Sequence, residues 1–235
     1  MDEPACPDCL KPPALCVCAG IERIGNRHFL LILQHPQEQD HALGTARLAL
    51  RHVARGRLAV GLSWPNLAKA AGQPADPKRW AALYLGSAHP PSGHPLAVVD
   101  RHGAPIAAEN AILASLDGIV LLDGSWSQAK ALWWRNPWLL KLHRIVLDIG
   151  RASRYGRVRK EPRRETLSTL EAAAFVLARL EGRPEIEATM NASFEALLRR
   201  YREGRAASTG QALARAAASG ESQDIGETST NHGSG

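Results

Sequence analysis

The stretch Gly118-Ile-Val-Leu-Leu-Asp-Gly-Ser-Trp-Ser-Gln-Ala-Lys130 joins an apolar run directly to a polar turn. The run predicts a buried strand, and the residues after it predict a tight turn and a helix. Ser125 followed three residues later by Gln128 is a capping-box pattern, so the helix is expected to begin here. Because ligands of open α/β sheets bind beyond the carboxyl ends of the strands, Asp123 is expected at the edge of a ligand site. The alternative is that Asp123 only begins a turn and that Trp126 only packs.

Strands and helices are predicted to alternate along the chain. Apolar runs predict further strands, and helical spacing or capping patterns predict helices. The strands are expected at 29–33, 82–85, 96–99 and 144–148, and the helices at 45–54, 108–116, 168–180 and 185–201. A Gly/Pro/His-rich loop is expected at 86–95. This order indicates an α/β fold with a mostly parallel sheet and helices on both faces.

The chain of 235 residues, 45% of them hydrophobic, is long enough to bury one sizeable core with a small appendage. Its net charge of +6 permits a polyanionic partner. Nine basic residues lie between positions 141 and 164 against only Asp148 and Glu161: Lys141, Arg144, Arg151, Arg154, Arg157, Arg159, Lys160, Arg163 and Arg164. Such dense arginine suits phosphate contacts and stacking on bases, although a solvated face is the simpler alternative.

All four cysteines lie near the start of the sequence, as Cys6-x-x-Cys9 and Cys16-x-Cys18. Paired thiolates at such short spacing can surround one tetrahedral ion, and zinc is the expected metal. Disulfides and an iron–sulfur cluster are the alternatives. Four protein ligands leave no open coordination position, so the role is expected to be structural. The residues expected to bind cofactor all lie beyond residue 120, so metal loss should loosen this segment more than it weakens cofactor binding.

Three regions are expected: a cysteine segment at 1–22, a catalytic domain at 23–205 and a disordered tail at 206–235. The tail is rich in Ala, Ser, Gly and Thr and has almost no large apolar residues. The first residues lack the pattern of a signal peptide, and no apolar run approaches the roughly 20 residues of a membrane span. A cytoplasmic protein is therefore expected. The sequence also lacks the glycine-rich patterns of dinucleotide-binding folds and phosphate loops.

Five segments in order resemble the DTW-domain family of tRNA-uridine aminocarboxypropyltransferases, which is named for an Asp-x-Thr-Trp motif. The segments are the cysteine cluster, 34–38, 123–126, 153–160 and 167–172, and the resemblance covers roughly residues 5–202. Ser125 replaces the motif's threonine, but both side chains carry a hydroxyl that can cap a helix. The resemblance implies a SPOUT-like fold with a trefoil knot that holds S-adenosylmethionine. It also implies transfer of the 3-amino-3-carboxypropyl group to N3 of a uridine at tRNA position 47, with methylthioadenosine as the other product.

The resemblance and the needs of this chemistry give a set of candidate site residues. Asp123, the motif aspartate, is the candidate base for the uridine N3 proton. The donor's carboxylate is expected near Arg154, Arg159 and the helix N-terminus at Ser168. An apolar slot for adenine is expected at Leu121, Leu122 and Leu167. Further cofactor candidates are Gly124, Ser125, Trp126, Thr169 and Glu171, and the tRNA candidates are His35, Glu38, Arg157, Lys160, Arg163 and Arg164.

Other functions remain open at this stage. A SPOUT-type RNA methyltransferase would use the same cofactor and fold, and an aminocarboxypropyltransferase could act on ribosomal RNA instead of tRNA. A non-catalytic, zinc-bearing RNA-binding protein could use the basic loop alone.

Overall fold

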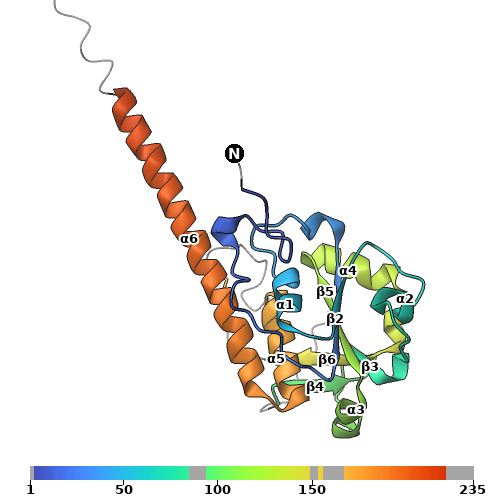
Figure 1. Cartoon of the computed structure of the whole chain (residues 1–235). Coiled ribbons are helices and arrows are strands. Elements are labelled where there is room, and N and C mark those ends of the chain that lie inside the picture. The colour runs from blue at the N-terminus through green and yellow to red at the C-terminus, as the bar shows by residue number, and fades with distance from the viewer. Residues whose placement is uncertain (1–2, 85–93, 149–152, 156–166, 221–235) are drawn as a thin grey trace, which may run out of the picture. The chain divides into compact units, whose positions relative to one another are not determined.

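The computed structural model describes residues 3–84, 94–148, 153–155 and 167–220, with side chains described up to residue 207. The chain divides into two compact units, Met1–Leu198 and Arg199–Gly235. The first unit contains the cysteine segment, the sheet and all helices up to the first part of the last one (Figure 1).

A six-stranded sheet forms the centre of the first unit. Its strands are β1 (Phe29–Gln34), β2 (Gly56–Val60), β3 (Trp80–Leu83), β4 (Leu96–Val99), β5 (Gly118–Asp123) and β6 (His143–Leu147). The strand order is β2-β1-β5-β3-β6-β4. All neighbours pair in parallel except β4, which runs antiparallel to β6 at the edge. The predicted mostly parallel sheet is confirmed.

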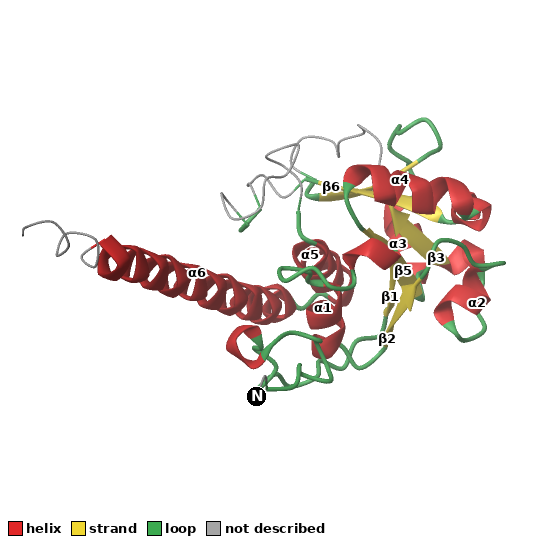
Figure 2. Cartoon of the chain, turned by 90° about the horizontal axis from the view of Figure 1, so that it is seen from above, coloured by secondary structure: helices red, strands yellow, loops and turns green. Residues whose placement is uncertain are grey.

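Helices cover both faces of this sheet (Figure 2). All six residues of β1 are buried, as expected for a strand that is covered on both sides. Leu31 and Leu33 pack in one core cluster with residues of α2 (Leu67–Ala71) and α4 (Trp126–Arg135). Leu30 and Ile32 point to the other face, because neighbouring strand residues alternate between the two faces. Helices α1 (Ala46–His52) and α5 (Thr169–Glu181) lie on that side of the sheet (Figure 2). Helix α3 (Glu109–Ser115) precedes the central strand β5.

Several element boundaries differ from the predictions. Strand β3 begins at Trp80 rather than at residue 82, because the fully buried Trp80 packs against Phe29 of β1, with ring centres 5.7 Å apart. Strand β6 begins and ends one residue early. Strand β2 was not predicted, because it is an edge strand whose first two residues are exposed and which shows no clear alternation. The short helix α2 was also missed. Four 3-10 turns connect elements: Pro13–Leu15, Pro36–Glu38, Pro77–Arg79 and Pro137–Lys141.

The last helix, α6 (Pro184–Gly220), extends past the predicted end of order at residue 205. The first compact unit ends within it, directly after the buried Leu197 and Leu198. Beyond this point the alanine-rich sequence lacks an apolar stripe but has high helix propensity. The structure describes residues 206–220 as helix, where the sequence predicts a disordered tail. The remainder of the predicted tail, 221–235, lies outside the described residues.

No helix in the described part of the chain is both long and apolar enough to cross a membrane. The predicted loop 86–95 falls mostly on residues that the structure does not describe. The same applies to most of the path between β6 and α5, on which a trefoil knot would depend.

Candidate active site and candidate metal centre

Asp123 lies at the carboxyl edge of the sheet, where the sequence places it. It is the last residue of β5 and pairs in register with Gln34, the last residue of β1. The backbone N–H of His35 donates to the Asp123 carbonyl at 2.9 Å, so the two strand ends stay together as they leave the sheet. Because both strands are parallel, their first polar side chains emerge at one point.

Among the described residues, Gln34 and Thr169 hold the Asp123 carboxylate, which is only 8% exposed. Gln34 Nε2 donates to Oδ2 at 2.8 Å, and the Thr169 hydroxyl donates to Oδ1. These two bonds use one carboxylate oxygen each and so fix the orientation of the Asp123 side chain.

Two capped helix N-termini flank this carboxylate. Ser125 caps α4 in a capping box with Gln128, and Ser168 caps α5 in a second box with Glu171. The positive ends of helix dipoles favour negative charge nearby. The edge of the sheet therefore stabilises negative charge, both on Asp123 and on an anionic group of a ligand. Thr169, the first residue of α5, links the second helix directly to Asp123.

Gly124 is required by close packing rather than by its backbone angle. A Cβ at this position would lie 2.8 Å from Gln128 Cβ and 3.5 Å from His35 Cβ. A side chain here would push α4 away from the end of β1 and disturb Asp123 next to it.

Glu171 holds the described part of the arginine-rich loop against α5. Its buried carboxylate accepts hydrogen bonds from the Ser153 hydroxyl at 2.7 Å and from the Arg154 N–H at 2.9 Å. The Arg154 guanidinium lies 3.6 Å from Glu171 and donates to Glu195 at 2.8 Å. Its charge is thus shared with two carboxylates of the protein. Arg154 is at the predicted place, but a ligand carboxylate would have to compete for it.

The predicted apolar slot is only partly assembled from the named leucines. Leu121 is buried in β5, and Leu122 packs against the core cluster on the α2 and α4 side of the sheet. Consecutive strand residues point to opposite faces, so these two side chains cannot line the same wall. Leu167 is half-buried just before the α5 cap, and Trp126 is 43% exposed on the first turn of α4.

The tRNA candidates fall into two groups. His35 and Glu38 lie on the loop after β1, where the His35 ring accepts the Gln37 N–H at 3.3 Å. Glu38 lines a small cavity of about 30 Å³ together with Gln34 and Arg47. Arg157, Arg159, Lys160, Arg163 and Arg164 lie outside the described residues.

Two residues of the edge were not chosen from the sequence. Gln34 ends the apolar run of β1 just as Asp123 ends that of β5. This shared position at the end of a strand is the sequence feature that could have identified Gln34 as a site residue. Its Oε1 is buried and has no hydrogen-bond partner within the described part of the chain. Thr45 accepts the Leu170 N–H at 3.2 Å in the first turn of α5. No sequence pattern links Gln34 to Asp123 or Thr45 to Leu170, because the partners are 89 and 125 residues apart.

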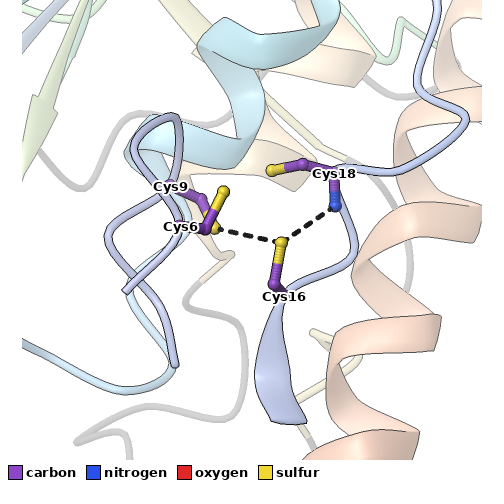
Figure 3. A group of neighbouring side chains, drawn as sticks. All are labelled: Cys6, Cys9, Cys16 and Cys18. Atoms are coloured by element: carbon purple, nitrogen blue, oxygen red, sulfur yellow. Dashed lines mark hydrogen bonds between the residues drawn. The ribbon is translucent and has the colours of Figure 1, made fainter. Parts of the chain in front are cut away.

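The four cysteines come together as predicted (Figure 3). Their sulfur atoms all lie within 4.8 Å of one another, and Cys9 Sγ is 3.8 Å from Cys16 Sγ. A tetrahedral zinc site with Zn–S bonds of about 2.3 Å has sulfur–sulfur edges of about 3.8 Å. All four are free cysteines, so the cluster has the size of a metal site and not that of two disulfides.

The surroundings of the cluster also favour a bound cation. Burial raises the pKa of the Cys9 and Cys18 thiols, since thiolates without a counter-ion are costly there. The pKa of Cys6 is lowered to about 7, mainly by the hydrogen bond from the Cys9 N–H. Lys11 Nζ, in a side chain that is only 5% exposed, donates to the Ala42 carbonyl at 2.8 Å and so ties this segment to the loop before α1.

The fold and this edge define a class of α/β protein with a buried carboxylate between two helix N-termini and a separate four-cysteine centre. The sequence matches the DTW domain over residues 3–202, so the chain belongs to the DTW-domain family. It is 32% identical over 193 residues to tRNA-uridine aminocarboxypropyltransferase 2 of Drosophila melanogaster, covering 79% of this chain and 70% of the relative. Proteins of the same name from Macaca fascicularis and Mus musculus are 27% identical, over 83% of this chain. The match spans 62% of each of these two relatives, which is less than two thirds of their length. No solved structure matches the chain.

Proposed function

We propose that this protein is a tRNA-uridine aminocarboxypropyltransferase. The observation that carries the proposal is Asp123, the motif aspartate of the DTW family, held at the sheet edge by Gln34 and Thr169. The curated relatives that carry this activity in their names support the same reaction. Transfer to N3 of uridine at tRNA position 47 remains our prediction for the exact target.

The reaction needs a base, because uridine N3 carries a proton. In the proposed mechanism Asp123 accepts this proton as N3 forms a bond to the carbon next to the sulfonium on its amino-acid side. The bond from that carbon to sulfur breaks, and the electron pair leaves with methylthioadenosine. Gln34 and Thr169 keep the carboxylate in one orientation, which is the positioning that such proton transfer requires.

S-adenosylmethionine would supply the activated carbon and the thioether leaving group. The described residues fit a donor of this kind. Two helix N-termini favour its carboxylate, and the unpartnered Gln34 Oε1 offers an acceptor beside Asp123. The N-terminus at Ser168 is a better candidate for the carboxylate than Arg154, which the protein itself pairs with Glu171 and Glu195.

Three finer points belong to the same proposal. The SPOUT-like fold with a trefoil knot, which the family resemblance implies, stays a prediction. We predict that Cys6, Cys9, Cys16 and Cys18 bind one structural zinc ion, on the sulfur geometry above. The cytoplasmic location stays a prediction.

One experiment tests the function directly. The protein is incubated with S-adenosylmethionine and unmodified tRNA, the RNA is digested, and the nucleosides are analysed by mass spectrometry. Aminocarboxypropyl-uridine together with methylthioadenosine is the expected result. Methylated nucleosides with S-adenosylhomocysteine would indicate a methyltransferase. Modification of ribosomal RNA in a parallel reaction would show that ribosomal RNA is the substrate. If a separate binding measurement found no affinity for S-adenosylmethionine, the non-catalytic alternative would be favoured.

The arginine-rich loop is proposed to bind tRNA phosphates. Replacing Arg163 and Arg164 by Ala should weaken tRNA binding and flatten its salt dependence by roughly one unit of slope per lost phosphate contact. An unchanged slope would place the tRNA on another surface.

A further inference from the structure

Helix α4 has an exposed face that consists of two tryptophans with a lysine between them. Trp126 is 43% exposed and Trp134 is 75% exposed. Residues four apart lie on one side of a helix, so Trp126, Lys130 and Trp134 form a single row about 12 Å long. Lys130 Nζ lies 5.5 Å from the centre of the Trp126 ring. We call these three residues the α4 aromatic face.

Trp134 takes no part in the described hydrophobic core. Helix α4 buries Ala129, Leu132 and Trp133, and Trp134 lies about 100° around the helix from Trp133, turned away from these contacts. A fully buried tryptophan removes a large apolar area from water, yet Trp134 leaves most of its ring in contact with solvent. Exposed apolar area of this kind, concentrated on one face, is typical of a binding surface.

The charge around the face indicates an anionic occupant. Between Asp123 and Asp148 the sequence contains no acidic residue. The same interval contains four basic residues, of which Lys130, Arg135 and Lys141 are exposed, whereas the Arg144 guanidinium lies over the rings of Tyr84 and Trp133. Exposed aromatic rings interleaved with cations are suited to nucleic acid, because bases stack on the rings while the cations bind phosphates.

The position of the face relates it to the reaction. Trp126 is the first residue of α4 and follows Asp123 by three residues, so the row begins at the site and leads away from it. We propose that the α4 aromatic face binds unpaired nucleotides of the substrate RNA next to the target uridine. Trp134 stacks on a base, and Lys130 contacts a phosphate. This inference rests on the proposed function, which it extends by naming the surface that holds the RNA.

The test measures binding of labelled tRNA by fluorescence anisotropy with the full chain and without S-adenosylmethionine. Trp134→Ala should weaken binding roughly 5- to 150-fold, the range for losing one stacked base. Trp134→Phe should stay within about threefold of the wild type, because it keeps an aromatic ring, whereas Trp134→Leu should behave like Ala. Leu62→Ala is the matched control, since Leu62 is also apolar and 38% exposed but lies off the helix.

Salt dependence separates the two roles within the face. Lys130→Ala should reduce the slope of log affinity against log salt by roughly one unit, and Trp134→Ala should leave that slope unchanged. Thermal unfolding should not shift downward for Trp134→Ala, because the side chain is exposed and alanine favours helix.

Wild-type affinity in Trp134→Ala, or in Trp134→Leu, would overturn the inference. If Trp134→Ala instead changed the mass measured by sedimentation and left RNA affinity intact, the face would be a contact between two copies of the chain, which also overturns it. The proposed function is tested separately. If the wild type formed no aminocarboxypropyl-uridine but Trp134→Ala still weakened RNA binding, the RNA-binding surface would be supported and the proposed reaction would not.

Discussion

The Asp123 carboxylate accepts hydrogen bonds from two side chains that are far apart in the sequence. Gln34 and Thr169 use one oxygen each, so a base at this position is rigid before substrate arrives. The same two bonds make an Asn substitution structurally mild. The Asn oxygen can accept from Thr169, and the Gln34 amide can turn so that its oxygen accepts from the Asn N–H.

We therefore expect Asp123→Asn to lower transfer by roughly 10²- to 10⁴-fold, the range typical of losing a general base. Affinity for S-adenosylmethionine should change much less. Single-turnover formation of aminocarboxypropyl-uridine and calorimetric cofactor binding measure the two effects separately. Asp117→Asn is the matched control, because Asp117 directly precedes the same strand at its opposite end and pairs with Arg79 at the surface.

Near-normal turnover by the Asn variant would make Asp123 a structural turn residue. Complete loss of cofactor binding would make it a pocket-building residue, and the base would then have to be sought at Glu38, His35 or a bound water.

His52 gives the protein a pH-dependent stability. Its ring is fully buried, and neither nitrogen has a hydrogen-bond partner within the described residues. Burial lowers its pKa from 6.5 to about 4, with a smaller contribution from Arg51. A lowered pKa in the folded state means that the unfolded state binds the proton first as pH falls. Stability from this group is therefore present above the unfolded pKa of about 6.5 and is lost toward pH 4.

The free energy of unfolding should fall by up to about 2 kcal/mol between pH 7 and pH 5 through His52 alone. Urea unfolding at both pH values measures this loss, and His52→Leu should remove most of the His52 part. The pKa of buried His28 is also lowered, mainly by burial, so the variant should keep a smaller dependence of the same sign. A pH dependence equal to that of the wild type in His52→Leu would contradict the assignment.

At the scale of elements, the two capping boxes at the site should contribute unequally to the free energy of unfolding. Ser168 is 3% exposed and accepts the Glu171 N–H at 3.1 Å, whereas Ser125 is exposed and accepts the Gln128 N–H at a longer 3.4 Å. Losing a cap costs about 0.5–2 kcal/mol, and the buried cap should lie at the upper end. Ser168→Ala should thus lower Tm by roughly 4–8 °C, and Ser125→Ala by less than half of that.

Differential scanning calorimetry of both variants checks this order. Ser168→Ala should also reduce transfer, because the adjacent Thr169 then holds Asp123 less firmly. Equal Tm shifts in the two variants would show that burial of the cap does not matter here.

The cysteine segment forms part of the first compact unit, with Lys11 and Cys9 lining the small cavity that Gln34 and Glu38 share. Metal removal by a chelator should expose the first 20 residues to proteolysis and lower Tm, because metal binding contributes to folding. Affinity for S-adenosylmethionine should fall less than the stability of the cysteine segment. A small decrease is expected, because the cysteine segment and Gln34 line the same cavity. Metal analysis that finds neither zinc nor iron near one equivalent per chain would rule out the centre.

At the scale of the molecule, the sequence correctly predicted the features that local patterns determine, such as helix starts and buried strands. Capping boxes located the starts of α4 and α5, and apolar runs located β1 and β5, so Asp123 was placed correctly at the edge. Gln34 and Thr45 were missed because their roles come from strand pairing and helix packing across long separations. Leu121 and Leu122 were assigned to one slot, although the period of a strand places neighbouring residues on opposite faces.

The end of the ordered core is also a property of the whole chain. Phe194, Leu197 and Leu198 are the last large buried residues in the part of α6 whose side chains are described, each at most 2% exposed. The Phe194 ring packs edge-on against Tyr155 at 4.9 Å, and the Tyr155 hydroxyl donates to the Leu43 carbonyl at 2.9 Å. This contact links α6 to the loop before α5 and to the loop before α1.

We expect a chain that ends after Arg205 to unfold within a few degrees of the full-length protein, because the compact unit that holds the sheet ends at Leu198. A chain that ends after Ala192 loses three buried side chains worth about 1.5–3 kcal/mol each. That sum of roughly 5–9 kcal/mol is comparable to the entire stability of a typical domain, so the shorter chain should show no cooperative transition. Thermal melts followed by circular dichroism compare the two. A cooperative melt of the shorter chain, or its loss in the longer one, would move the boundary of the folded unit away from Leu198.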